Sequence, residues 1–300
     1  MVNVFKLQTT QASSIKQLIE CLAPLLTDVN FTFSPKYITN DSSDSESDSE
    51  SNSIESNSIE SNDSNESKQK VGGVIIKEIN KQSTIIVHCK LDADKFETYE
   101  YNYHKKELQI GISLSYLVKA LKCMNSFDTM TWEIDDDNLN ELIITFETKT
   151  KDKIENKRFR LNLMDIDNDN LDIKPVGFSY LVIMPSHDFQ KYCKDMSLAT
   201  DKLELICNKD KLIFRGKGDL GTVEFETEES LGGLQIQMTS EENIIVQGIY
   251  DLKYLSIFTK CTNLCNNVNM YLKNDYPLVI QYSVAALGRI KLVLAPSKKF

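Results

Sequence analysis

The chain has 300 residues, which is enough for two domains of common size. Hydrophobic residues make up 41 % of it, which supports real cores, and no apolar run approaches the roughly 20 residues of a membrane-spanning helix. No signal peptide is visible, and the seven cysteines form no CxxC pair. We therefore expect reduced cysteines in an intracellular protein rather than disulfides or a zinc site.

The net charge of −10 is spread unevenly along the chain. Residues 40–70 carry nine Asp and Glu against two Lys, so they account for −7 and leave −3 for all other residues. This segment lacks the apolar surface that would offset the entropy of ordering, and we expect it to be disordered. Its serines lie close to acidic residues, which suits an acid-directed kinase, but a tolerated loop expansion explains the segment more simply. An acidic average does not exclude nucleic-acid binding by basic residues gathered on one surface.

The first half of the chain is predicted to contain strands and two helices. In the first helix, over residues 12–26, Ile15, Leu18 and Ile19 recur at the spacing of one helix face. Pro24 must end or kink this helix. The other elements of this half are a helix over 113–124 and strands over 3–9, 29–37, 74–79, 84–91, 97–103, 108–112, 130–134, 141–148 and 157–163.

The second half repeats this order of elements. It is predicted to contain helices over 186–198 and 250–262 and strands over 178–184, 202–207, 211–216, 221–227, 233–239, 243–248, 267–273, 277–283 and 288–294. The repetition predicts two similar domains, residues 1–162 and 178–300.

The segment between them, residues 163–177, is predicted to be an extended connector. It is too polar for a buried strand and too rich in Asp and Asn for a helix interior. Three of its acidic residues alternate as in a calcium-binding EF-hand loop, namely Asp165, Asp167 and Asp169. That loop also needs Gly at its sixth position and Glu at its twelfth, where this chain has Asn170 and Val176. The sequence therefore argues against a calcium site.

Two of the predicted helices repeat the same arrangement of lysines. Lys119 and Lys122 in the second helix match Lys191 and Lys194 in the third, each pair at the same offsets from its apolar stripe. At about 100° per residue, both pairs point away from that stripe. A charged outer face often serves only solvation, but the repetition favours a shared positive surface.

The sequence offers no catalytic constellation. The three histidines, His88, His104 and His187, belong to no metal or nucleophile motif, and GxxxxGK, HExxH and GxSxG are absent. His187 is expected to be exposed in the first turn of the helix over 186–198. We therefore predict that the protein is not an enzyme.

Five stretches carry a more specific signal. In chain order they are SLSYLVKALKC (113–123), LMDIDNDNLDI (163–173), MPSHDFQKYCKDMS (184–197), KYLSIFTKCTNL (253–264) and YPLVIQYSVAALGRIKLVLAP (276–296). Together they resemble the proliferating cell nuclear antigen (PCNA) family of eukaryotic-type DNA sliding clamps. The resemblance implies an α+β DNA-clamp fold, in which two similar domains each carry antiparallel sheets with two helices on the inner face.

This resemblance also implies a function. Three subunits would close head to tail into a ring around double-stranded DNA, with all helices lining the hole and no cofactor or metal. The clamp would cooperate with a clamp loader and tether DNA polymerase and other enzymes that carry a Gln-aliphatic-aromatic-aromatic motif. It would work in the nucleus or in a viral replication compartment. A subunit of a hetero-trimeric checkpoint-type clamp and a monomeric DNA-binding processivity factor are the alternatives.

The family's site positions transfer to numbered residues of this chain. The implied DNA-binding cations are Lys16, Lys119, Lys122, Lys191, Lys194, Lys253 and Lys260. The implied pocket for partner peptides consists of Ile79, Ile86, Leu171, Ile173, Pro277, Val293, Ala295 and Pro296. Val293 stands where the family often has an aromatic residue, and Ala23 and Leu198 stand where it commonly has a basic residue or His. Lys209 lies where many relatives carry a lysine modified by ubiquitin-like proteins.

The resemblance places the subunit contact on two strands, residues 157–163 and 222–228. The implied interface residues are Arg158, Phe159, Arg160, Leu161, Val223, Glu224, Phe225 and Glu226. The first strand is basic and the second is acidic. We therefore hypothesise that opposite charges across this strand pair fix the direction of assembly.

Overall fold

The structure is a computed structural model that describes residues 3–38, 70–149, 153–167, 176–219, 221–239 and 244–297. Residues 40–69 of the acidic segment lie outside the described residues. The same holds for Asp169 in the EF-hand-like spacing and for Leu171 and Ile173 of the predicted pocket.

The first half contains both predicted helices. Its elements are β1 (Asn3–Thr9), α1 (Ala12–Leu22), β2 (Asp28–Phe33), β3 (Tyr37–Ile38), β4 (Lys70–Val71), β5 (Gly73–Ile79), β6 (Ile85–Asp92), η1 (Ala93–Lys95), β7 (Thr98–Tyr101), β8 (Leu108–Ser113), α2 (Leu114–Lys122), β9 (Thr129–Asp135), β10 (Asn138–Lys149) and β11 (Ile154–Asn162). The prediction that α1 continues to residue 26 is wrong: the helix ends at Leu22, and Ala23 caps it with helical backbone. The cause is Pro24, which has no N–H to donate to the carbonyl four residues earlier. The sequence did not predict the short strands β3 and β4.

The second half repeats the order. Its elements are β12 (Tyr180–Pro185), α3 (Ser186–Met196), β13 (Lys202–Cys207), β14 (Lys211–Gly218), β15 (Gly221–Glu228), β16 (Gln235–Met238), β17 (Val246–Asp251), α4 (Leu252–Phe258), η2 (Thr259–Leu264), β18 (Asn267–Leu272), β19 (Leu278–Val284) and β20 (Gly288–Leu294). The helix predicted over 250–262 is α-helical only to Phe258 and then tightens into the 3-10 helix η2.

The strands form three large sheets. Their strand orders are β11-β10-β9-β1-β7, β15-β14-β13-β17 and β16-β12-β18-β19-β20-β6-β5-β2-β8. The five-stranded sheet belongs to the first half and the four-stranded sheet to the second, while both halves contribute to the nine-stranded sheet. The halves therefore share one continuous backbone hydrogen-bond network.

The seam of the nine-stranded sheet is the antiparallel ladder between β20 and β6. It runs from the pair Gly288↔Leu91 to the pair Leu294↔Ile85 without a break in register. Side chains along each strand alternate between the two faces, so Leu292 and its partner Val87 point into the core. Neither half can move independently of the other without breaking this ladder.

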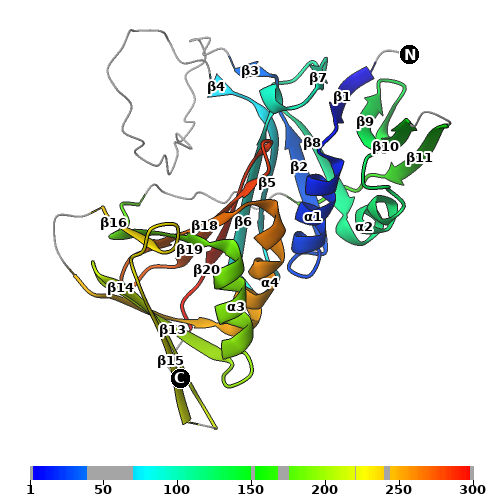
Figure 1. The fold of residues 1–300 in the computed structure, drawn as a ribbon. Helices are drawn as coiled ribbons and strands as arrows, with labels where there is room; N and C mark the ends of the chain where they lie inside the picture. The colour runs from blue at the N-terminus through cyan, green and yellow to red at the C-terminus, as the bar shows by residue number, and fades with distance from the viewer. Residues whose placement is uncertain are drawn as a thin grey trace, which may run out of the picture.

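The helices form one layer on one side of the sheets, where α1 and α2 lie beside α3 and α4 (Figure 1). η2 contacts both α1 and α3, which joins the helix pairs of the two halves. Ile15, Leu18 and Ile19, predicted to share one face of the first helix, are buried on α1. The other buried apolar residues of the stripes are Leu22 on α1, Leu117, Ala120 and Leu121 on α2, and Phe189, Cys193 and Met196 on α3, where Tyr192 is half-buried. The helix surfaces that face away from the sheets are left for charged residues.

All seven cysteines lie within the described residues as free thiols, and most are buried. Burial raises the pKa of Cys89 and of Cys207 to about 12, since the thiolate is disfavoured away from water. No group of His, Cys, Asp and Glu that could hold a metal ion occurs in the described part of the chain. Over the same residues, no helix is long and apolar enough to cross a membrane.

The seam yields a stability prediction. Leu292→Ala removes a side chain that is 1 % exposed between the halves and should lower the free energy of unfolding by about 2–5 kcal/mol. Leu231→Ala is the matched control, because the same atoms are lost from a fully exposed side chain, and it should change stability by less than about 0.5 kcal/mol. Urea unfolding followed by far-UV circular dichroism measures both. Equal losses for the two variants would contradict the seam's role.

Candidate functional site

The seven predicted DNA-binding cations all lie in the helix layer. Lys16 is on α1, Lys119 and Lys122 are on α2, Lys191 and Lys194 are on α3, Lys253 is on α4 and Lys260 is on η2. Six of them are exposed and Lys16 is half-buried. None forms an ion pair with a described residue within 4.0 Å. Their charge is therefore directed to solvent rather than neutralised by neighbouring acids.

Two of these lysines line the same groove at the junction of the halves. Lys16 and Lys260 line a groove of about 590 Å³ between α1, α3 and η2. The amide of Gln17 donates a hydrogen bond to the carbonyl of Lys260 over 3.4 Å, and that of Gln190 donates to the carbonyl of Thr259 over 3.1 Å. The groove is thus polar, with Glu20 beside the two lysines in its lining, and it crosses from one half to the other.

The two strands predicted to form the subunit contact are end strands of their sheets. β11 ends the five-stranded sheet and β15 ends the four-stranded sheet. Phe159 and Leu161 of β11 are half-buried against the core, while Arg158 and Arg160 alternate with them on the exposed side. On β15, Val223 and Phe225 pack inward, and Glu224 and Glu226 are exposed. The predicted residues therefore divide into apolar inner and charged outer sets on both edges.

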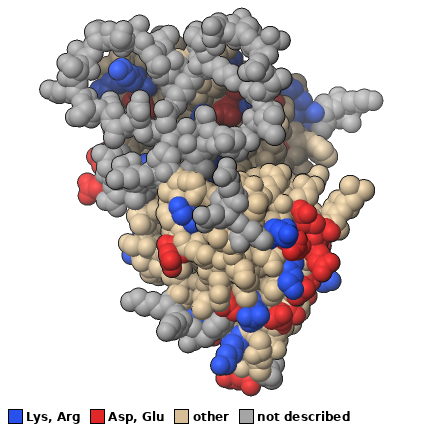
Figure 2. Space-filling view, turned by 90° about the vertical axis from the view of Figure 1, so that its left-hand side faces the viewer, with Lys and Arg blue, Asp and Glu red and all other residues tan. Residues whose placement is uncertain are grey.

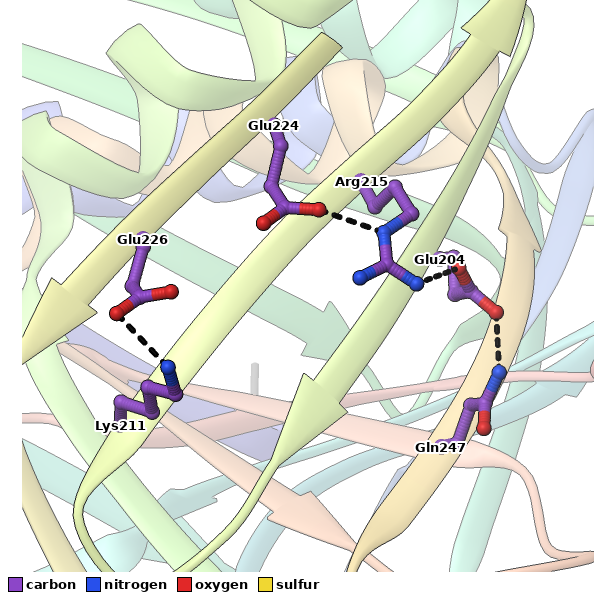
Figure 3. Close-up of polar contacts among 6 residues, drawn as sticks. All are labelled: Glu204, Lys211, Arg215, Glu224, Glu226 and Gln247. Atoms are coloured by element: carbon purple, nitrogen blue, oxygen red, sulfur yellow. Dashed lines mark hydrogen bonds and ion pairs between the residues drawn. The ribbon is translucent and has the colours of Figure 1, made fainter. Parts of the chain in front are cut away.

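Ion pairs within the chain engage several of these charges, which the sequence did not predict. On the sheet of β15, Arg215 bonds Glu224 over 2.7 Å and the buried Glu204 over 3.4 Å, and Lys211 bonds Glu226 over 2.9 Å (Figure 3). These bonds raise the pKa of Arg215, chiefly through its hydrogen bond with Glu224. Figure 2 shows acidic side chains with Lys and Arg among them on the lower part of the molecule, where β13 to β15 lie in Figure 1.

The partner edge is engaged in the same way, since Arg160 bonds Glu141 over 3.1 Å. Arg158 and Glu228 form no ion pair with a described residue. These two exposed charges on opposite edges are therefore the ones most available to a second subunit.

An apolar row crosses the face of the nine-stranded sheet that points away from the helices. Successive strand neighbours in this outer apolar row are Leu181 (β12), Tyr271 (β18), Val279 (β19), Val293 (β20), Ile86 (β6) and Ile79 (β5). Val279 and Tyr271 are buried beside Phe178, whereas Val293, Ile86 and Ile79 are half-exposed. The exposed end of the row is thus a hydrophobic surface next to the seam.

This row brings together predicted pocket residues that are distant in the sequence. Ile79, Ile86 and Val293 are direct cross-strand neighbours, and the amide of Ala295 bonds the carbonyl of Thr84 over 2.9 Å. Pro277 directly precedes Leu278 of β19, which pairs with Leu294 of β20. Pro296 is exposed. Sequence analysis missed the contribution of Phe178, Leu181, Tyr271, Tyr276 and Val279. For Tyr271 and Val279 the signal is an apolar residue on the outer face of β18 or β19, opposite the face buried in the core.

Comparison with known proteins decides the family. The chain matches the family models for the proliferating cell nuclear antigen N-terminal domain over residues 61–170 and C-terminal domain over residues 172–297. It is 30 % identical over 223 residues to proliferating cell nuclear antigen of Caenorhabditis elegans, an alignment covering 74 % of this chain and 83 % of that protein. The chain belongs to the proliferating cell nuclear antigen family. The α+β DNA-clamp fold predicted from the sequence is confirmed.

Two viral relatives of the family are also similar to the chain. A probable DNA polymerase sliding clamp of Acanthamoeba polyphaga mimivirus is 29 % identical over 296 residues, which cover 98 % of this chain and 62 % of that protein. A probable DNA polymerase sliding clamp 1 of Paramecium bursaria Chlorella virus 1 is 25 % identical over 297 residues, covering 98 % and 97 %. The chain thus spans less than two thirds of the mimivirus protein and nearly all of the Chlorella virus protein.

Beside the outer apolar row, this member of the family carries a cation cluster, which we define as Lys77, Lys90, Arg289 and Lys291, and these four surround His88. Burial lowers the pKa of His88 to about 4, and repulsion from the four surrounding cations acts in the same direction. Burial and repulsion from Arg289 lower the pKa of Lys291 to about 8. The electrostatic potential at this part of the sheet is therefore positive.

The pKa of His88 gives a prediction for the pH dependence of stability. Between about pH 6.5 and pH 4 the unfolded chain binds a proton that the native His88 does not bind, so stability falls as the pH falls. His88→Gln removes this loss. Between pH 7 and pH 5, the variant should gain about 2 kcal/mol in unfolding free energy relative to the wild type. A pH profile of stability for His88→Gln that runs parallel to that of the wild type would contradict the assignment.

Proposed function

We propose that this chain is a DNA polymerase processivity factor, a sliding clamp that binds double-stranded DNA with its helix layer and catalyses no reaction itself. One observation carries the proposal: seven cations occupy a single layer, free of ion pairs to described residues, in a chain whose net charge is −10. Its location would be the nucleus or a viral replication compartment.

The proposed DNA contact is electrostatic and independent of base sequence. Lysine side chains on helix surfaces reach phosphates as point charges, and phosphate contacts position a protein without reading bases. Such contacts exchange readily along the duplex, which allows a clamp to slide. The groove between Lys16 and Lys260 continues the basic layer across the junction of the halves.

The proposed assembly is a ring of three copies, closed head to tail by pairing of β11 with β15 of the next copy. Both strands end their sheets, which leaves one edge of each unpaired within the described chain. Contact between two different edges is heterologous, and it closes into a ring when the rotation between subunits fits. Complementary edges on the same chain favour identical subunits over a hetero-trimeric clamp or a monomeric factor.

The proposed partners are a clamp loader, DNA polymerase and other proteins with a Gln-aliphatic-aromatic-aromatic motif. Their anchor side chains would occupy the half-exposed surface of Ile79, Ile86 and Val293, with Pro277, Ala295 and Pro296 beside it. Leu171 and Ile173 of the connector belong to the same proposed site. Apolar anchors in a desolvated pocket supply most of the affinity of such peptides.

A DNA-binding measurement tests the proposed inner surface. The variant Lys119→Gln, Lys122→Gln, Lys191→Gln and Lys194→Gln should bind duplex DNA more weakly, and its slope of log K against log salt should fall by up to about one per lysine. The matched control neutralises four exposed lysines outside the helix layer: Lys81, Lys105, Lys106 and Lys209. Fluorescence anisotropy from about 50 to 200 mM salt measures both slopes. Equal salt dependence of DNA binding in the two variants would contradict the proposed DNA surface.

A charge reversal tests the proposed subunit contact. Arg158→Glu with Arg160→Glu places acidic residues opposite the acidic β15 edge, so the protein should run as a 34.2 kDa monomer at moderate salt. Lys105→Glu with Lys106→Glu makes the same charge change away from both edges and should keep the wild-type mass. Light scattering on a sizing column gives the masses. A trimer that survives the Arg158 and Arg160 reversal would count against charge as the determinant of assembly.

A further inference from the structure

The outer face of the nine-stranded sheet places the cation cluster beside the outer apolar row. Along β20, β6 and β5, the residues two positions from Val293, Ile86 and Ile79 are Lys291, His88 and Lys77. One step further, Arg289 pairs with Lys90. Because each step is two residues of one strand, the first cations lie about 7 Å from the apolar row and the next about 13 Å.

The accessible members of the cluster are at its ends. Arg289 is exposed and Lys77 is half-buried, while Lys291 is 7 % exposed at the centre. Lys90 bonds Asp92 over 3.2 Å, whereas Lys77 and Arg289 form no ion pair with a described residue. Two cations next to an apolar surface are therefore available to an incoming ligand.

A peptide that lies across these strands advances about 4.8 Å per strand, so it can follow the apolar row over β20, β6 and β5. An acidic side chain one or two residues from an apolar anchor reaches about as far as the spacing between the rows. It would then meet Lys77, one step from the row, or the long side chain of Arg289, which extends from two steps away, while its neighbour stays on Ile86 or Val293. The geometry thus matches a ligand that is both apolar and acidic.

We propose that the cation cluster selects partner peptides with an acidic residue within about two positions of the aliphatic anchor. The proposal rests on the partner-peptide surface of the proposed function and adds a charge requirement to it. A nucleic-acid backbone would also pair with cations, but it has no apolar groups to bind the adjoining apolar row. The cluster also lies on the face opposite the helix layer. A protein segment uses both rows at once.

The test compares three labelled synthetic peptides by fluorescence anisotropy. All carry the same Gln-aliphatic-aromatic-aromatic anchors, and the two positions next to the aliphatic residue are Glu, Gln or Lys. At about 50 mM salt the Glu peptide should bind about two- to fivefold more tightly than the Gln peptide, and the Lys peptide more weakly. The preference should shrink at about 500 mM salt, because salt screens exposed charges.

Variants assign the preference to the cluster. Lys77→Gln with Arg289→Gln should bind all three peptides with nearly the same affinity and leave the Gln peptide unaffected. Lys81→Gln with Lys106→Gln removes two exposed cations elsewhere and should keep the wild-type preference. Because the comparison of peptides on the wild-type chain is already decisive, it holds even if a variant folds poorly.

Each other outcome has a distinct meaning. Equal binding of the three peptides to the wild type would mean that the cations are neutralised within the chain and would overturn the inference. A preference that persists in Lys77→Gln with Arg289→Gln would also overturn it. Duplex DNA that displaces the Glu peptide from the wild type but not from this variant would assign the cluster to nucleic acid instead. Failure of the Gln peptide to bind at all would overturn the proposed partner surface itself.

Discussion

The ladder between β20 and β6 is the constraint on which the other features of the molecule depend. It joins two halves with the same order of elements into one nine-stranded sheet, with an unbroken register from Gly288↔Leu91 to Leu294↔Ile85. Because side chains alternate along each strand, this register fixes which residues face the helices and which face outward. It thereby sets the helix layer on one side and aligns Val293 with Ile86 on the other.

The two faces have different chemistry for the same reason. The helices bury their apolar stripes on the sheets, so their lysines must point away, and a chain of net charge −10 presents a basic layer. The opposite face shows an apolar row bordered by cations. Some charges outside these two surfaces are paired within the sheets, as Arg215 is with Glu204 and Glu224 (Figure 3). The proposed assembly, DNA and partner contacts thus fall on separate surfaces.

Periodicity in the sequence predicted most elements, and β13 and β20 have the predicted bounds. Periodicity did not predict that the apolar pattern of one helix would continue over a change of helix type, as where α4 tightens into the 3-10 helix η2 after Phe258. The lysine positions on α2 and α3 followed from helix geometry. The outer apolar row did not, because the pairing of Val293 with Ile86 joins segments about two hundred residues apart, which no local pattern encodes. The ion pairs of Arg160 and Arg215 also depend on which residues the strands place opposite each other. The sequence therefore did not predict that charges on these two edges are neutralised within the chain.

In the proposed assembly, one chain carries both complementary edges and three copies close into a ring. The most direct test is the native mass of the wild-type protein at micromolar concentration, by light scattering on a sizing column. We expect a mass three times that of the 34.2 kDa chain, with no larger open assemblies. A monomer at that concentration would contradict it.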